Sequence, residues 1–298
     1  MYGLGASLYN RKAVAKVYSV KGRPADNPLI VHISKKEELQ NLTRKLLPEA
    51  NLLINKFWPG PLTLVCRRSK NVPKTVTAGL NTVAVRMPSH PVAQKLLRSL
   101  GEPIAAPSAN RSGRPSPTRY KDVVQELGDA VDFILSGGHS RLGLESTVLD
   151  ITRRPFTILR PGSVTLEELQ TVVPEVQYYE RKKIKGAVRS PGLKHRHYEP
   201  RCKVVLVASK DWDKTCEEWK KKKFKLGVYA FRQKIEKDKK IIFFRSFKGN
   251  KKAYAKHLYA AFFDAEKAGV EALLVEAISP KGVGRAIMDR LQRASGNG

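Results

Sequence analysis

The fold class is decided by residues 82–109, TVAVRMPSHPVAQKLLRSLGEPIAAPSA. Thr82–Met87 predicts a strand, and Pro91–Leu100 predicts a helix that Gly101 ends, because a residue without Cβ turns left-handed at little cost. Residues 103–109 then predict a buried strand. A strand, a helix and a strand in close succession indicate an α/β protein rather than an all-α or all-β one.

The same alternation continues on both sides of this stretch. Upstream, Ser34-Lys35-Lys36-Glu37 has capping-box spacing and predicts a helix with Leu39, Leu42 and Leu46 on one face. Further strands are predicted over residues 63–68, 131–136, 146–151 and 156–159, and further helices over residues 120–127 and from the capping box at Thr165.

A change of composition divides the chain. Residues 180–201 are basic and polar, contain Gly and Pro, and show no hydrophobic period, which predicts a linker. We therefore expect a domain over residues 1–179 and a smaller α/β domain over residues 202–298. Strands of the second domain are predicted near 203–208, 226–231, 240–244 and 270–276, and helices near 214–223, 253–268 and 284–294.

Composition excludes several classes of protein. With 298 residues and 41% hydrophobic content, the chain is long enough for two folded domains and is not disordered. Three cysteines without C-x-x-C spacing (Cys66, Cys202, Cys216) exclude a disulfide scaffold and a cysteine zinc site, and they predict reduced thiols in the cytoplasm. No apolar run approaches the roughly 18 residues of a spanning helix.

The charge points to anionic partners. The chain carries 56 Lys and Arg against 27 Asp and Glu, a net charge of +29. This excess is spread along the chain and favours nucleic acid, nucleotides or other phosphates.

Four loops next to predicted strand ends concentrate the residue types that bind a triphosphate. A Walker P-loop, a complete dinucleotide fingerprint and an H-E-x-x-H zinc motif are all absent from the sequence. The loops supply cations, hydroxyls and amides, which suit a charge spread over several phosphate oxygens. They are Lys21–Asn27, Pro107–Gly113, Glu145–Thr147 and Arg160–Gly162.

Several motifs together resemble the YrdC-like threonylcarbamoyl-AMP synthases. The first part of the chain carries MYGLGA (1–6), residues 21–32, WPGPLT (58–63), VRMP (85–88), APSAN (106–110), STV (146–148) and LRPG (159–162). Ser190-Pro191-Gly192, with His197-Tyr198 and Pro200, resembles the linker of the two-domain members. Residues 282–293 resemble the end of their second domain.

The resemblance implies a fold and an activity. The expected fold is a YrdC-like open twisted α/β sheet with a concave basic face, followed by a smaller Rossmann-like domain. The expected reaction forms L-threonylcarbamoyl-AMP from L-threonine, bicarbonate and ATP, releasing pyrophosphate. Other proteins then transfer the threonylcarbamoyl group to adenosine 37 of tRNA.

Site residues follow by matching the family motifs to this sequence. The residues implied for ATP are Lys21, Arg23, Asn27, Thr82, Ser108, Ser116, Arg160 and, on the linker, Arg196, with Tyr198 as an alternative linker contact. The residues implied for threonine are His32, Arg86, Ala106 through its backbone, and Ser146. Arg86 has the fork geometry for the α-carboxylate. Mg²⁺ is expected with ATP, although no carboxylate cluster identifies its ligands.

Two other functions also fit parts of the sequence. A noncatalytic protein could use the same basic face to bind tRNA or double-stranded RNA, and the synthase itself could contact tRNA directly. A carbamoyl-adenylate enzyme acting on carbamoyl phosphate is a third hypothesis, but the zinc-finger and acylphosphatase-like parts of such proteins are missing.

One expectation concerns the start of the chain. In the family, a Pro-Thr-Glu-Thr-like motif that helps to bind threonine precedes the position of Tyr2. We therefore expect residues 1–298 to bind ATP but to form threonylcarbamoyl-AMP poorly, and a chain extended upstream to be more active. Full threonine-dependent turnover by the 298 residues would contradict this expectation.

Overall fold

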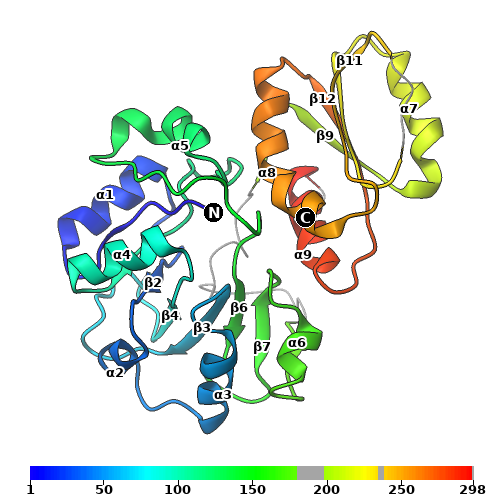
Figure 1. Cartoon of the computed structure of the whole chain (residues 1–298). Coiled ribbons are helices and arrows are strands. Elements are labelled where there is room, and N and C mark those ends of the chain that lie inside the picture. The colour runs from blue at the N-terminus through cyan, green and yellow to red at the C-terminus, as the bar shows by residue number, and fades with distance from the viewer. Residues whose placement is uncertain (180–197, 234–237, 297–298) are drawn as a thin grey trace.

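The computed structural model describes residues 1–179, 198–233 and 238–296, which form two α/β units (Figure 1). The larger unit contains a mixed sheet in the order β1-β5-β2-β4-β3-β6-β7-β8. Strands β1 to β8 span Ala6–Ser7, Ile30–His32, Leu62–Arg67, Thr82–Arg86, Ile104–Ala105, Thr147–Asp150, Thr157–Arg160 and Gln177–Tyr178.

The α-helices of this unit, α1 to α6, span Arg11–Lys21, Leu39–Leu42, Pro48–Phe57, Pro91–Leu100, Tyr120–Leu127 and Leu166–Gln170. Four of them, α1, α2, α3 and α6, pack on one face of the sheet. The main core joins apolar residues of α1, α2, α3 and α6 to alternate residues of the strands, such as Val31, Leu64 and Val85. The residues between them face the other side, where a small cluster of Ile30, Val65, Ala84, Val148 and Leu159 forms. The period of two along each strand thus creates a face that this core leaves open to polar side chains.

The smaller unit is a parallel sheet in the order β11-β10-β12-β9. Strands β9 to β12 span Lys203–Val207, Leu226–Ala230, Ile241–Ser246 and Ala272–Glu276, and helices α7 to α9 span Trp212–Lys220, Lys251–Lys267 and Gly284–Ala294. Helices α8 and α9 lie on the side of the sheet that faces the larger unit, and α7 lies on the opposite side (Figure 1). The predicted elements of this domain are confirmed to within a few residues.

Charged residues join the two units. Arg114 donates to both carboxylate oxygens of Glu266 on α8, at 2.7 Å each. Arg119 donates to Asp264 on the same helix at 2.7 Å. Gly143 packs against this helix so closely that a Cβ would lie 2.2 Å from the carbonyl oxygen of Ala255. Bidentate and partly buried pairs of this kind hold a defined orientation better than exposed ones do.

The predicted strand over residues 131–136 is wrong. In the structure this segment is not a strand, and the side chains of Phe133 and Leu135 are 88% and 50% exposed. A strand needs a neighbour for its N–H and C=O groups, and no described ladder reaches this segment. Strand β1 ends the sheet, has two residues and pairs only with β5 among the residues described. An apolar run indicates a strand but does not supply its partner.

Two other predicted elements are shorter than expected. Of residues 103–109, only Ile104–Ala105 form a strand. The helix predicted from Ser34 is a 3₁₀ turn followed by α2. The backbone N–H groups of Ser34 and Lys35 donate to the carboxylate of Glu38, so the capping acid is Glu38 rather than Glu37. It ends at Leu42 because Thr43 is extended and forms a bridge with Arg68. The hydrophobic pattern of the sequence was not used to predict helices α1 and α3, which the structure adds.

The other predicted strands and helices of the larger domain are confirmed. Cys66, Cys202 and Cys216 are buried free thiols. Within the described residues, no helix combines the length and the apolar character needed to cross a bilayer.

Candidate active site

Strand alternation places four polar side chains on the sheet face opposite the main core. His32 and Arg86 follow Ile30 and Ala84 by two residues, and Thr63 and Ser146 precede Val65 and Val148 by two. A spacing of two keeps each polar residue on the same face as its apolar neighbour. His32 and Arg86 are also direct partners in the parallel β2–β4 ladder. The fold therefore brings to one face three of the residues that are predicted to bind the substrate threonine, His32, Arg86 and Ser146.

These residues also share one end of the sheet. His32 and Arg86 lie at the ends of β2 and β4. Thr63 lies near the beginning of β3, Ser146 directly precedes β6, and β3 is antiparallel to β4 and parallel to β6. Arg160 ends β7, which is antiparallel to β6.

Arg160 reaches this face through an irregularity in its ladder. The register shifts between Val148 and Leu149, so that Leu149 pairs with Ile158 while Val148 pairs with Arg160. A β-bulge of this kind re-aims a side chain. Arg160 donates to the carbonyl oxygen of Ser146 at 3.0 Å and to its hydroxyl at 3.2 Å.

Gly162 lets the loop after β7 lie directly on the Ser146 backbone. A Cβ at this position would lie 2.3 Å from the nitrogen of Thr147 and 2.5 Å from the carbonyl carbon of Ser146. No real Cβ approaches backbone atoms so closely, so only glycine fits here. This contact fixes the backbone around Ser146 from the side of Arg160.

Lys21 is the last residue of α1, and Arg23 follows it by two residues. Gly22 between them caps the helix with φ 59°. The ammonium of Lys21 donates to the carbonyl oxygens of Ser108 and Asn110, at 2.8 and 2.6 Å, and to the side chain of Asn110 at 3.1 Å. An ammonium has three N–H groups, so Lys21 uses all of them to hold the loop of Ser108. Arg23 donates from Nε to the Asn27 carbonyl oxygen and from Nη2 to its side chain, at 2.9 and 2.7 Å.

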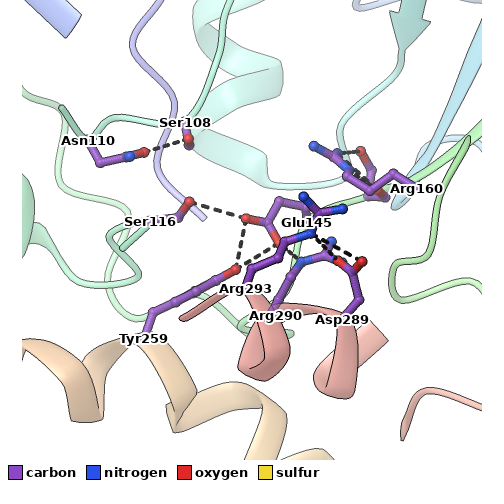
Figure 2. Close-up of polar contacts among 10 residues, drawn as sticks. Ser108, Asn110, Ser116, Glu145, Arg160, Tyr259, Asp289, Arg290 and Arg293 are labelled. Carbon is purple, nitrogen blue, oxygen red and sulfur yellow. Dashed lines mark hydrogen bonds and ion pairs between the residues drawn. The ribbon is translucent and has the colours of Figure 1, made fainter. Parts of the chain in front are cut away.

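A cavity of about 840 Å³ joins most of the predicted residues. It is lined by nine of them: Lys21, Arg23, His32, Arg86, Ala106, Ser108, Ser116, Ser146 and Arg160. The N–H of Ala106 donates to the Ile30 carbonyl oxygen at 2.9 Å, so a backbone contact with a ligand would use the Ala106 carbonyl oxygen. Ser108 donates to Asn110 at 2.6 Å, and Ser116 donates to Glu145 at 3.2 Å (Figure 2).

Three predicted residues are not among those that line the cavity. Asn27 is buried and binds Arg23. Thr82 begins β4, about 13 Å along the strand from Arg86 at roughly 3.3 Å per residue, and pairs with Arg67 at the opposite end of the sheet. Arg196 lies outside the described residues. Tyr198 is described and lines the cavity, where its ring packs against that of Tyr259 at an interplanar angle of 33°, with centroids 5.4 Å apart.

Arg86 is prepared to receive a carboxylate. Its Nε donates to the Gly60 carbonyl oxygen at 2.9 Å. Within the described parts of the chain, neither terminal nitrogen of this guanidinium has a protein acceptor. The fixed Nε sets the plane of the guanidinium and leaves its two terminal nitrogens as a fork, which matches the two oxygens of a carboxylate.

The cavity is strongly electropositive. Burial and then Arg160 lower the pKa of Arg86 to about 10. Burial, with a smaller contribution from Arg160, lowers the pKa of Arg23 to about 10. Arg160 therefore lies within electrostatic range of both other guanidiniums. Because these cations repel one another in a site of low dielectric, an anionic ligand among them is favoured.

His32 is neutral in this environment. Burial and then Arg86 lower its pKa to about 3, and Nδ1 lies 3.2 Å from the Ile30 carbonyl oxygen, to which it can only donate. A neutral imidazole adds no further positive charge beside Arg86.

Sequence reasoning assigned no individual role to four residues around the site, although Asn110 and Glu145 lie in two of the predicted anion-binding loops. Asn110 organises the loop of Ser108, and Glu145 lines the cavity just before Ser146. Tyr259 and Arg290, from the smaller domain, contact Glu145 (Figure 2). A lone acidic residue next to an apolar strand was a signal that Glu145 needs a cationic partner, but its spacing does not say which one.

The described residues offer no metal site made of protein ligands. Among residues 1–179, 198–233 and 238–296, no group of three His, Cys, Asp or Glu could hold an ion.

The comparisons with known proteins cover both units. Residues 1–162 match the Sua5, YciO and YrdC family, described as "Telomere recombination", and residues 164–296 match the "Threonylcarbamoyl-AMP synthase, C-terminal domain". The threonylcarbamoyl-AMP synthase of Pyrococcus abyssi is 40% identical over 304 residues, which cover 99% of this chain and 88% of that protein. The Bacillus subtilis enzyme of the same name is 37% identical and is 87% covered, again over 99% of this chain.

The chain belongs to the threonylcarbamoyl-AMP synthase family. The crystal structure of P. abyssi Sua5 complexed with L-threonine superimposes with a TM-score of 0.92 at 39% identity, over 99% of this chain and 88% of that one. The family and the two-domain α/β fold inferred from the motifs are thereby confirmed.

We predict that Gly162→Ala disrupts the synthase site. The added methyl group meets backbone rather than flexible side chains, so the segment Glu145–Thr147 must move, at a cost of about 1–3 kcal/mol in the free energy of unfolding. Chemical denaturation and threonine titration measure the two effects. Gly128→Ala is the control, because its Cβ would meet only Val124 at an ordinary 3.6 Å. Wild-type threonine affinity in Gly162→Ala would contradict this role.

We predict that His32 makes the stability of this family member fall with acid. The pKa of His32 is about 6.5 unfolded and about 3 folded, so the contribution of neutral His32 is complete above pH 6.5 and is lost as the pH falls toward 3. The loss approaches about 1.4 kcal/mol per pH unit within that window. Denaturation of His32→Gln should show a shallower slope than the wild type between pH 6.5 and 4, while the two slopes should be equal near pH 8. Equal slopes would assign the acid sensitivity to other groups.

Proposed function

We propose that this chain forms L-threonylcarbamoyl-AMP from L-threonine, bicarbonate and ATP, with release of pyrophosphate. The observation that carries the proposal is the single cavity in which the fork of Arg86 lies beside a second set of cations and hydroxyls. Membership of the synthase family supports the reaction, and L-threonine in the P. abyssi Sua5 structure supports the amino-acid substrate.

The threonine subsite is the part of the cavity around Arg86. The terminal nitrogens of Arg86 bind the α-carboxylate. Ser146 lies on the same face, at the second strand from that of Arg86, and contacts the rest of the amino acid. The carbonyl oxygen of Ala106 suits the amine as an acceptor. Neutral His32 contributes an imidazole without repelling that amine.

The ATP subsite is the part around Arg23, Ser108, Ser116 and Arg160. Arg23 is held by Asn27, so its guanidinium is oriented before a phosphate arrives. Lys21 has committed its N–H donors to the Ser108 loop. We therefore assign to Lys21 loop positioning and long-range charge rather than a phosphate hydrogen bond. A site whose donors are ordered in advance binds a triphosphate without a large entropic cost.

The reaction takes place where the two subsites meet. The threonine amine attacks bicarbonate, water leaves, and a carbamate forms. A carbamate oxygen then attacks the α-phosphorus of ATP, and the bond from that phosphorus to the oxygen bridging to the β-phosphate breaks, which releases pyrophosphate. Arg160 is electrostatically coupled to both Arg86 and Arg23, so it is the cation that faces the charge developing between the carbamate and the α-phosphate.

The second step needs no general base. A carbamate is already anionic, so nothing has to remove a proton before it attacks. In the described lining, the carboxylates are Glu145 and Asp132. Glu145 is occupied by Ser116, Tyr259 and Arg290, and Asp132 pairs with Lys16 at an exposed position. Positioning and electrostatic stabilisation therefore account for this second step.

Mg²⁺ is part of the proposal as a partner of ATP. Because the described residues offer no cluster of acidic ligands, the triphosphate itself would carry the ion and the protein would bind the complex. A bound Mg²⁺ would neutralise phosphate charge.

The remaining partners are also proposals. The product would pass to proteins that transfer the threonylcarbamoyl group to adenosine 37 of tRNA, and direct contact of this chain with tRNA stays a prediction. The division into a domain over residues 1–179, a linker over 180–201 and a domain over 202–298 also stays a prediction. Most of this linker lies outside the described residues.

We predict opposite substrate defects for two arginine variants. Arg86→Ala should weaken threonine binding far more than ATP binding, since losing a bidentate carboxylate partner costs about 1.5–3 kcal/mol. Arg23→Ala should weaken ATP binding more. Calorimetric titration of each substrate separates the two effects, and Arg67→Ala, on the exposed end of β3, is the matched control. Equal losses for both substrates in both variants would contradict the two subsites.

The proposed reaction is tested by pyrophosphate release from ATP. We expect release that depends on both threonine and bicarbonate, with threonylcarbamoyl-AMP detected by mass spectrometry. Omitting threonine or bicarbonate is the control. Tight RNA binding without any threonine-dependent release would instead favour a noncatalytic RNA-binding protein.

A further inference from the structure

Two helices of the smaller domain reach the wall of the ATP subsite and meet at Glu145. Arg290 of α9 donates from Nε to Oε2 of this carboxylate at 2.9 Å. The hydroxyl of Tyr259 on α8 lies 3.1 and 3.2 Å from the two carboxylate oxygens and donates to them. Ser116, from the ATP subsite, donates to Oε1 at 3.2 Å, so one buried carboxylate joins three segments (Figure 2).

Every member of this group is withdrawn from solvent. Arg290 and Tyr259 are fully buried, and Glu145 and Ser116 are 5% and 1% exposed. A buried carboxylate tolerates its charge only when cations and donors surround it. For Glu145, burial alone would raise the pKa, but Arg290 and then Arg160 outweigh burial and lower the pKa to about 2.

The backbone links this group directly to the reacting centre. Glu145 precedes Ser146, whose carbonyl oxygen and hydroxyl hold Arg160. If Arg290 were absent, Arg160 would be the next strongest cation acting on Glu145. The carboxylate would then compete with Ser146, and with substrate, for Arg160.

We propose that Arg290 and Tyr259 are positioning residues, which occupy the Glu145 carboxylate and thereby leave Arg160 and Ser116 correctly placed for ATP. Through them, the smaller domain completes the ATP subsite rather than merely adjoining it. This inference rests on the proposed function, because it assigns Arg160 and Ser116 to nucleotide binding.

Docking of the domains does not depend on this group alone. Arg114 binds Glu266 and Arg119 binds Asp264, and neither of these ion pairs includes Glu145. Variants at the two kinds of contact therefore separate loss of docking from loss of positioning.

The test measures the ATP dissociation constant at 25 °C, with melting temperatures recorded for every variant. Arg290→Met should weaken ATP binding at least about tenfold, because it frees a buried charge that hydrogen bonds had satisfied. Tyr259→Phe, which keeps the ring packed against Tyr198, should weaken it by a few fold. Two controls should bind ATP like the wild type: Arg293→Met, whose guanidinium contacts Asp289 and not Glu145, and Asp264→Asn at the docking contact.

A double variant and the pH dependence identify positioning. Arg290→Met with Glu145→Gln removes both charges and should recover most of the ATP affinity. In Arg290→Met alone, the pKa of Glu145 should rise from about 2, so affinity should improve relative to the wild type as the pH falls from 8 to 5. The charged or titratable groups that act on or with Glu145 are Arg290, Asp289, Arg160, Lys21, Tyr198, Tyr259 and the Met1 amino group.

Two results would overturn the inference. One is lower melting temperatures in Arg290→Met and Tyr259→Phe with unchanged ATP affinity, and the other is a double variant that binds ATP no better than Arg290→Met. If Arg290→Met does not fold, the ATP dissociation constants of Tyr259→Phe and Arg290→Lys test the inference instead. Failure of the proposed function is distinguishable, since the wild type would then lack threonine-dependent pyrophosphate release whatever the variants bind.

Discussion

The structure of the site follows from one electrostatic constraint, the burial of several cations in a single cavity. Arg23, Arg86 and Arg160 each direct Nε to a main-chain carbonyl oxygen, of Asn27, Gly60 and Ser146 respectively. Neutral acceptors orient a guanidinium but do not cancel its charge. The remaining positive potential is what favours carboxylate and phosphate ligands, and it stabilises the charge that develops in the proposed second step, which needs no general base.

The second consequence of this constraint is the role of the smaller domain. Among the described residues of the cavity wall, the one buried carboxylate is Glu145. Its charge is balanced from two sides, by Arg160 within the site and by Arg290 across the domain boundary. A two-domain arrangement thus adjusts the electrostatics of a site that lies mostly in the first domain. The ion pairs of Arg114 and Arg119 with α8 provide the docking geometry in which this balance is possible.

Much of the fold was predictable from local sequence because hydrophobic period and terminal signals are local. Pro91–Leu100 with Gly101 forms the predicted helix, and Thr165 with Glu168 forms the predicted capping box. The segment 131–136 shows the limit of this reasoning. Its composition is that of a strand, but strand formation depends on a neighbouring strand, which is a tertiary property.

The sequence by itself determined the α/β class, the family and most residues of the cavity, because the motifs place cations and hydroxyls at strand ends. Only the tertiary structure decided which of them meet. Thr82 and Arg86 share a strand but lie at its opposite ends, whereas the bulge in β7 turns Arg160 into the cavity. Lys21 donates its hydrogen bonds to the Ser108 loop. Arg290 binds Glu145 although the two residues are 145 positions apart in the chain. Burial and charge balance act through space, so the partners of a buried ion cannot be read from its neighbours in sequence.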